Sequence, residues 1–161
     1  SQRIPLSWPP PMRNHTTSCS LALALVLAAT LTACSTAYQD ARSSSLVKNP
    51  GGGYDEERGP GGLIKVRYAG NQAILMYQVQ HYALYRCAEI AQREGSPYFA
   101  LYQTLADALQ DRRAGTVRPT TLLGIPHAEV YIKLHPAAGP GLLSTAQTLA
   151  DLKPIVFKDP T

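Results

Sequence analysis

The outward-facing side chains of one predicted strand are candidates for metal chemistry. Residues 127–136 read HAEVYIKLHP, and their alternation places His127, Glu129 and His135 on one face. Imidazole and carboxylate groups can bind zinc. At a strand rise of about 3.3 Å per residue, His127 and His135 are about 26 Å apart, so one ion cannot contact both. His127 and Glu129 supply two ligands at most, and the competing interpretation is the solvated face of a sheet. We therefore predict no metal site and no cofactor.

A thiol and an imidazole occur together in the predicted helix over residues 72–94. Cys87 and His81 are six residues apart, which turns them about 120° away from each other on a helix. They cannot form a thiol–imidazole pair. Cys87 falls on the apolar stripe of this helix, where a free cysteine behaves as a small hydrophobic residue.

The same helix carries candidates for partner binding. Tyr77, His81 and Tyr85 recur at every fourth position, so they form a ridge that can bind a partner or a glycan, or pack beneath a loop. Arg86 lies near the apolar stripe. It can clamp a carboxylate of a partner, or it can form an ion pair with Glu89 or with the sheet.

No motif of a known catalytic class occurs in the chain. The patterns G-x-S-x-G, H-E-x-x-H and the P-loop are all missing. The net charge is +4, and basic and acidic residues are interspersed without a basic stripe, which argues against a nucleic-acid partner. We predict that the protein is not an enzyme, and we name no catalytic residue.

Cys34 follows the most apolar run of the chain, residues 21–31. This run is shorter than the roughly 20 residues that a membrane-spanning helix needs, and it fits the apolar region of a secretory signal. The residues Leu31-Thr32-Ala33-Cys34 resemble the lipobox of bacterial lipoprotein precursors. The resemblance implies that a lipid is attached to the Cys34 sulfur and that a peptidase cuts just before Cys34. The attached lipid would anchor the protein to a membrane.

These features divide the chain into four parts. Residues 1–11 fit no part of a signal and are predicted to be an upstream extension, with the true start at Met12. Residues 12–33 are predicted to be the lipoprotein signal peptide. Residues 34–52 begin with the lipidated cysteine and continue as a flexible tether rich in Ser, Gly, Asn and Pro. Residues 53–161 are predicted to form the folded domain.

The remaining cysteines and the residue after Cys34 indicate the compartment. The chain has three cysteines; cleavage removes Cys19 and lipidation modifies Cys34, so Cys87 has no partner for a disulfide. By resemblance to the sorting pattern of Gram-negative lipoproteins, Ser35 favours the outer membrane. We expect an exported protein, lipid-anchored there, with its domain facing the periplasm.

Hydrophobic patterning predicts an α+β domain. The expected fold is a small antiparallel sheet in β-β-α-β-β-α order, with two helices packed on one face. A short helix near residue 104 and an exposed loop are expected within segment 104–126, and Pro154 is expected to end the last helix, leaving a strand or an extended tail. The predicted strands are 54–58, 62–69, 97–103 and 127–136, and the predicted helices are 72–94 and 144–153. The first two strands are expected to form a hairpin, 97–103 is expected to be buried, and Lys133 is expected to face outward with His135. Asn71 is expected to cap the first helix, Gly95 to end it, and Glu89 and Arg93 to pair within it.

The body of the chain resembles a family of small periplasmic lipoproteins of proteobacteria, a family with no assigned activity. The resemblance implies a periplasmic domain on a lipid anchor and supplies no catalytic residues. It rests on five motifs that occur in order: GGYDEE (52–57), VRYAGN (66–71), YALYRCAEIA (82–91), YFAL (98–101) and AQTLADLKP (146–154).

We therefore expect a lipid-anchored envelope protein that binds or supports another envelope protein or a cell-wall component. One alternative is a small periplasmic hydrolase or metal-binding protein that uses the face of His127 and Glu129. Another is an enzyme-binding subunit or inhibitor that acts through loop 104–126.

Overall fold

The computed structural model describes residue 38 and residues 52–158 of the chain. The chain divides into two units, Ser1–Ala33 and Cys34–Thr161. The predicted extension, signal peptide and Cys34, and most of the predicted tether, lie outside the described residues. Of the helices in the described part, none is both long and apolar enough to cross a bilayer.

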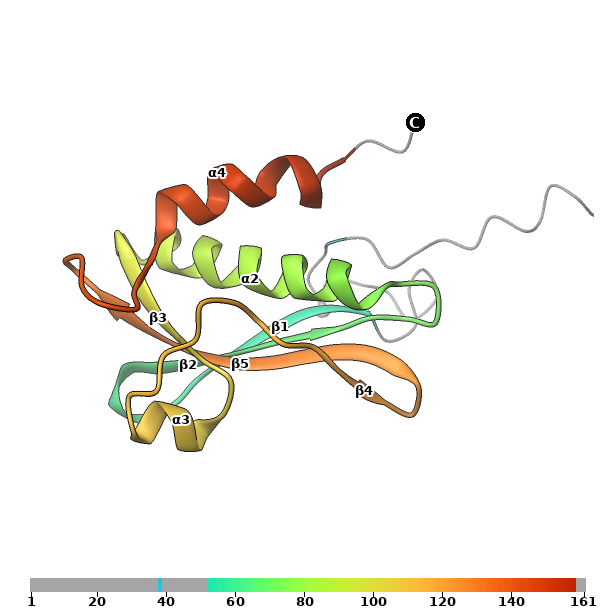
Figure 1. The fold of residues 1–161 in the computed structure, drawn as a ribbon, viewed down its shortest axis with the longest axis horizontal. Coiled ribbons are helices and arrows are strands. Elements are labelled where there is room, and N and C mark those ends of the chain that lie inside the picture. The colour runs from blue at the N-terminus through green and yellow to red at the C-terminus, as the bar shows by residue number, and fades with distance from the viewer. Residues whose placement is uncertain (1–37, 39–51, 159–161) are drawn as a thin grey trace, which may run out of the picture. The chain divides into compact units, whose positions relative to one another are not determined.

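The described residues form an α+β domain, as predicted (Figure 1). The main elements follow the order β-β-α-β-β-α, and short elements are inserted among them. The strands are β1 (Gly53–Arg58), β2 (Leu63–Ala69), β3 (Tyr98–Tyr102), β4 (Thr120–Leu122), β5 (Ile125–His135) and β6 (Leu143–Ser144). The helices are α2 (Met76–Arg93), α3 (Leu105–Leu109) and α4 (Thr145–Val156), and the 3-10 turn η1 (Pro60–Gly62) joins β1 to β2.

The sheet is antiparallel throughout, with the strand order β1-β2-β5-β3-β6. β5 is its central strand. β2 pairs along one side of β5, while β4 and β3 pair with successive parts of the other side. The predicted hairpin of the first two strands is confirmed, and Asp55 forms an ion pair with Arg67 directly opposite it.

The alternation in β5 separates a core face from a polar face. Ala128, Val130 and Ile132 are buried against the helix layer, whereas Glu129 and Lys133 are exposed on the other face. β3 continues the core face with the buried side chains of Phe99 and Leu101. The predicted facing of this strand is therefore confirmed.

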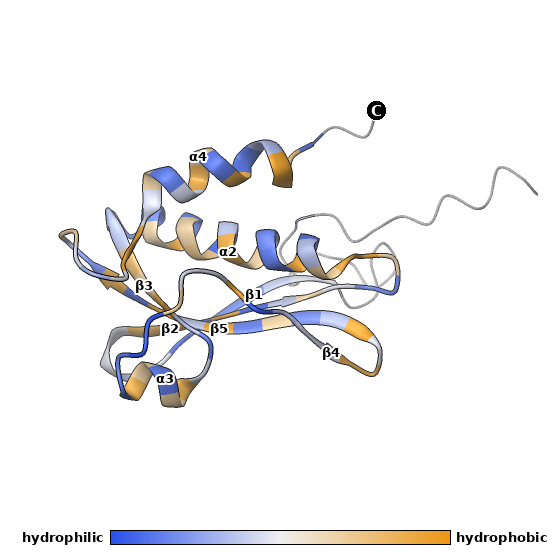
Figure 2. Cartoon of the chain, in the orientation of Figure 1, coloured by the Kyte–Doolittle hydropathy of each residue, from blue (hydrophilic) through white to orange (hydrophobic). Residues whose placement is uncertain are grey.

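The two longer helices lie on the same side of the sheet (Figure 1). α2 packs directly on the sheet and buries Val79, Cys87 and Ile90 completely. α4 packs against α2 and contributes Leu152 and Val156 to the core. Figure 2 shows that both helices carry apolar and polar positions along their length. The short helix α3 lies on the opposite face of the sheet.

Helix α2 begins later than the sequence predicts. Asn71, the expected N-cap, accepts a hydrogen bond from the amide of Ala73 in a separate turn. The helix starts at Met76, where the side chain of Gln78 accepts from the amide of Leu75. Its end agrees with the prediction: Gly95 has a φ of +70° and closes a Schellman motif.

Pro154 does not end α4, so the predicted stop is wrong. The helix continues to Val156, so the first residues expected to form a strand or an extended tail are helical. Proline forfeits one helical hydrogen bond. The amide of Phe157 still donates to the carbonyl of Lys153 at 3.0 Å, and burial of Val156 favours one more turn.

Tyr38 lies in the segment predicted to be a flexible tether, yet it packs against the domain. Its ring centroid lies 5.2–5.8 Å from the rings of Tyr54, Tyr82, Tyr85 and Phe157. Its hydroxyl donates a hydrogen bond to Glu89 of α2. Burial, followed by the neighbouring Glu89, raises the pKa of Tyr38, so this phenol stays protonated. The folded domain therefore includes a residue far upstream of β1.

We predict that Tyr38→Ala lowers the free energy of unfolding by about 2 kcal/mol, because it removes a half-buried aromatic ring from this cluster. Tyr38→Phe should cost about 1 kcal/mol by removing only the hydrogen bond to Glu89. Urea unfolding measures both. Tyr77→Ala, at an exposed ring of α2, is the control and should change little; equal effects at Tyr38 and Tyr77 would contradict the packing.

Candidate functional site

The polar face of the sheet is partly covered by the chain that joins β3 to β4. Thr104 caps α3 by accepting a hydrogen bond from the amide of Asp107, which confirms the predicted short helix. The next residues are predicted to form an exposed loop, and residues 112–119 are a loop in which Arg112, Gly115 and Arg118 are exposed. The loop is anchored to the domain, because the amide of Ala114 bonds to the carbonyl of Leu101 at 2.7 Å and Val117 is buried. It ends where Thr120 begins β4.

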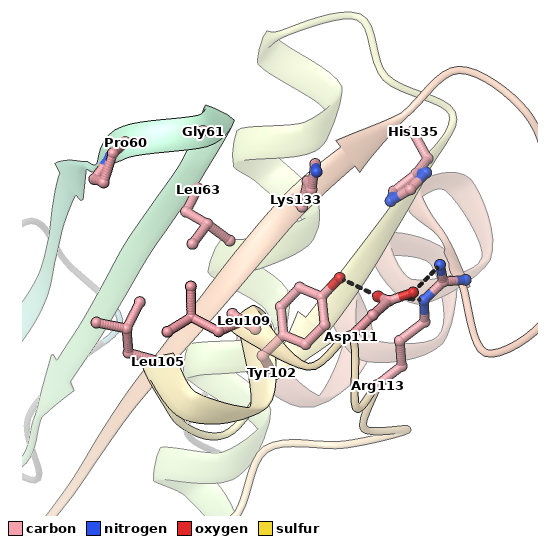
Figure 3. A pocket seen from close by; sticks show the side chains of 11 residues that line it. Pro60, Gly61, Leu63, Tyr102, Leu105, Leu109, Asp111, Arg113, Lys133 and His135 are labelled. Atoms are coloured by element: carbon pink, nitrogen blue, oxygen red, sulfur yellow. Dashed lines mark hydrogen bonds and ion pairs between the residues drawn. The ribbon is translucent and has the colours of Figure 1, made fainter.

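A pocket of about 630 Å³ opens on this face between α3, the η1 turn and β5. Figure 3 shows leucines on one side of the pocket and polar groups on the other. Leu63, Leu105 and Leu109 form the apolar wall. The polar wall consists of Tyr102, Asp111, Arg113, Lys133 and His135.

Asp111 joins two neighbours of the polar wall into a network. Arg113 donates to both carboxylate oxygens of Asp111, at 3.0 and 2.8 Å, and the Tyr102 hydroxyl donates to Oδ1 at 2.6 Å. The guanidinium of Arg113, and then the Tyr102 hydroxyl, lower the pKa of Asp111 to about 2. Arg113 also donates to the carbonyl of Pro140 at 2.6 Å. The network therefore neutralises the Asp111 charge and fixes one wall of the pocket.

Lys133 is the uncompensated cation of the pocket. No carboxylate among the described residues forms an ion pair with it, whereas Lys65 on the same face pairs with Glu129 at 3.5 Å. In Figure 3, Lys133 lies between the leucines and the polar network. His135 is next to it on this face, and its buried Nε2 has no hydrogen-bond partner within the described part of the chain. The arrangement can accept an acidic group beside an apolar one.

Of the three metal candidates of β5, His127 and Glu129 stay neighbours on one face, and His135 is separated from them. His127 Nε2 lies 3.2 Å from the Thr120 hydroxyl, and Glu129 binds Lys65 and Tyr131. His135 lies in the pocket near the other end of the strand. Among the described residues, no group of three or more His, Cys, Asp or Glu side chains is placed to hold a metal ion.

The four partner-binding candidates of α2 divide into two groups. Tyr77 is exposed and its ring stacks edge-on with His81, with centroids 6.1 Å apart. Tyr85 is buried beside Tyr38 and Phe157. The ridge expected from their spacing is therefore not one continuous surface.

Arg86 forms ion pairs with Glu89 and with the sheet, which is one of its two expected roles. It donates to Glu89 and to Glu56 of β1, both at 3.0 Å, and its guanidinium lies 3.9 Å above the ring of Tyr54. Arg93 joins the same network at Glu56, at 2.7 Å. The expected pair between Glu89 and Arg93 is replaced by these contacts. The Arg86 guanidinium thus bridges α2 to the first strand.

Cys87 is fully buried in α2, as its place on the apolar stripe predicts. Burial raises the pKa of its thiol, so the thiolate is disfavoured. The side chain contributes to the core and is not available as a nucleophile.

The sequence does not predict the pocket. Its pattern predicts only that Lys133 and His135 face outward on one strand and that Tyr102 lies in a buried strand. Asp111 and Arg113 carry no motif. One signal points to the site: within residues 52–158, Lys133 lacks the acidic partner that its basic neighbours on this face have.

No protein-family model, curated protein or solved structure matches the chain. The resemblance to periplasmic lipoproteins of proteobacteria therefore stays a prediction.

We predict that Glu56→Gln lowers the free energy of unfolding by about 1–2 kcal/mol at neutral pH, because it weakens the hydrogen bonds from Arg86 and Arg93. Burial acts to raise the pKa of Glu56, but hydrogen bonds and charges of Arg93 and Arg86 outweigh it, so folding lowers this pKa from 4.5. The stabilisation is complete above the unfolded pKa and is lost as the pH falls through the lower, folded pKa.

Urea unfolding at several pH values below neutrality measures this loss. In Glu56→Gln, stability should fall less steeply with acidification than in the parent protein. Glu57→Gln removes the adjacent charge from the other face of β1 and serves as the control. A parallel acid dependence in the parent and in Glu56→Gln would contradict the assignment.

Proposed function

We propose that this protein is a lipid-anchored, non-enzymatic binding protein of the bacterial cell envelope, held to the outer membrane through Cys34. The lipobox-like sequence Leu31-Thr32-Ala33-Cys34 supports the anchor. The packing of Tyr38 sets how far such an anchor would be from the domain, since Tyr38 contacts the domain and is four residues after Cys34. Four extended residues span at most about 14 Å, so the lipid and the domain are closely coupled.

The binding role rests on one observation: Lys133, between the apolar and polar walls of the pocket, has no ion-pair partner among residues 52–158. A partner that presents a carboxylate or another acidic group beside an apolar side chain satisfies both walls. Binding is favoured because Asp111 is already neutralised by Arg113 and does not repel an incoming anion. We infer that an envelope protein or cell-wall component with this chemistry is the partner.

A second candidate function uses the same surface. Segment 104–126 supplies α3, whose Leu109 is 77% exposed, and it contributes side chains to both walls of the pocket. An enzyme-binding subunit or inhibitor acting through this segment would place a partner against Leu109. The hydrolase or metal-binding alternative at His127 and Glu129 gains no comparable support.

The anchor is tested with Cys34→Ser and radiolabelled palmitate in a Gram-negative host. The parent protein should incorporate label because an acyl chain is attached to the Cys34 sulfur, and Cys34→Ser should incorporate none. Cys87→Ser is the control at the buried thiol and should keep the label. Label that survives Cys34→Ser would show that Cys34 is not the anchor.

The pocket is tested by photo-crosslinking in cells, with a photoreactive amino acid at position 109. Lys133→Met should reduce the yield of the crosslinked product about fivefold, because it removes the cation that binds the acidic group. Lys153→Met removes the same charge from α4, on the other side of the sheet, and should leave the yield unchanged. Equal yields from the two variants would contradict the proposed site.

A further inference from the structure

One end of the domain exposes large apolar side chains on two neighbouring segments. In the hairpin between β4 and β5, Leu122 and Leu123 are 64% and 94% exposed. At the start of α2, Leu75 and Tyr77 are 55% and 53% exposed, and Met76 is also exposed. Figures 1 and 2 show the hairpin and the start of α2 at the same end of the domain, both with strongly apolar positions. We call these five residues the apolar end.

A close backbone contact next to the apolar end joins the residue after β2 to the start of β5. The amide of Gly70 donates to the carbonyl of Pro126 at 2.9 Å. A Cβ atom at position 70 would lie 2.8 Å from that carbonyl oxygen and 2.2 Å from a methyl group of Ile74, so only glycine fits. Leu122 and Leu123 line a shallow pocket of about 280 Å³ with residues 68–70. The exposed leucines therefore sit on a fixed surface.

The apolar end is within reach of the proposed lipid. Tyr38 packs on Tyr82, and seven helical residues from Leu75 to Tyr82 span about 10 Å. Cys34 can be at most about 14 Å from Tyr38. A lipid on Cys34 thus brings the surface near Tyr38 and the start of α2 close to the bilayer. The exposed apolar side chains of this region are the apolar end and, at the end of α4, Ile155 and Phe157, which are 43% and 51% exposed.

We propose that the apolar end contacts the outer-membrane bilayer at its headgroup boundary and orients the domain on the membrane. This inference rests on the proposed lipid anchor. Leucine and methionine side chains gain by entering the acyl region, and a tyrosine ring suits the interface, where its hydroxyl stays hydrated. The anchor and the apolar end then act as two attachments, which hold a protein more stably than one chain.

The orientation separates the ligand pocket from the membrane. β5 begins at Ile125 beside the apolar end and carries Lys133 eight residues later, about 26 Å along the strand. With the apolar end on the bilayer, the pocket points away from it. A partner in the periplasm or in the cell wall can then approach the pocket while the domain stays on the membrane.

The contact is tested on lipidated protein purified from the outer membrane and reconstituted in phosphatidylethanolamine–phosphatidylglycerol vesicles with brominated acyl chains. Trp8 is the single tryptophan of the chain and precedes Cys34, so the processed protein lacks it. Leu122→Trp then supplies a reporter at the apolar end. Leu109→Trp supplies the matched control, another exposed leucine, replaced beside the pocket. Both sites are exposed, so neither substitution disturbs the core.

Leu122→Trp should lose most of its fluorescence to the brominated chains and shift its emission to the blue, whereas Leu109→Trp should keep its emission. Mass spectrometry first establishes that the protein carries lipid. Unquenched Leu122→Trp fluorescence from lipidated protein would overturn the bilayer contact and leave the anchor standing. A blue shift that already occurs in detergent, together with formation of a dimer, would have the same consequence. Protein without lipid would overturn the anchor and the inference with it.

Discussion

The two-sided alternation of β5 is the constraint on which the rest of the structure depends. One face must be covered, because the apolar side chains of Val130 and Ile132 are removed from water only when α2 packs over them. The other face then stays available for polar side chains. Since β5 pairs with β2, β3 and β4, every main strand inherits this division, and the pocket forms on the side that the helices leave open.

The features that could be predicted from the sequence are those set by periodicity. The facing of β5, the apolar stripe of α2 and the hairpin of β1 and β2 repeat a pattern over several residues, and burial of each pattern needs only a neighbouring layer. Local capping was predictable where a side chain and a backbone turn agree, as at Gly95. It failed at Asn71, where the side chain caps a separate turn before the helix starts.

The candidate site could not be predicted because its members meet only through strand pairing. Tyr98 lies opposite His135, which brings β3 and its following segment beside Lys133. No spacing in the sequence encodes that contact. Tyr38 was missed for a related reason: one aromatic residue in a polar segment has no period, and its partners come from three distant parts of the chain. Pro154 was misjudged because tertiary burial of Val156 outweighs one lost hydrogen bond.

The packing of Tyr38 also decides how the domain bears mechanical load. A pull on the chain before residue 38 reaches the tyrosine cluster and the Glu89 hydrogen bond before it reaches β1. β1 is an edge strand paired only with β2, and a force applied at Gly53 would peel its hydrogen bonds apart one after another. Tyr38 diverts that force into α2 and α4, which resist it as a packed unit. The aromatic cluster thus protects the edge strand β1 from a force applied upstream of it.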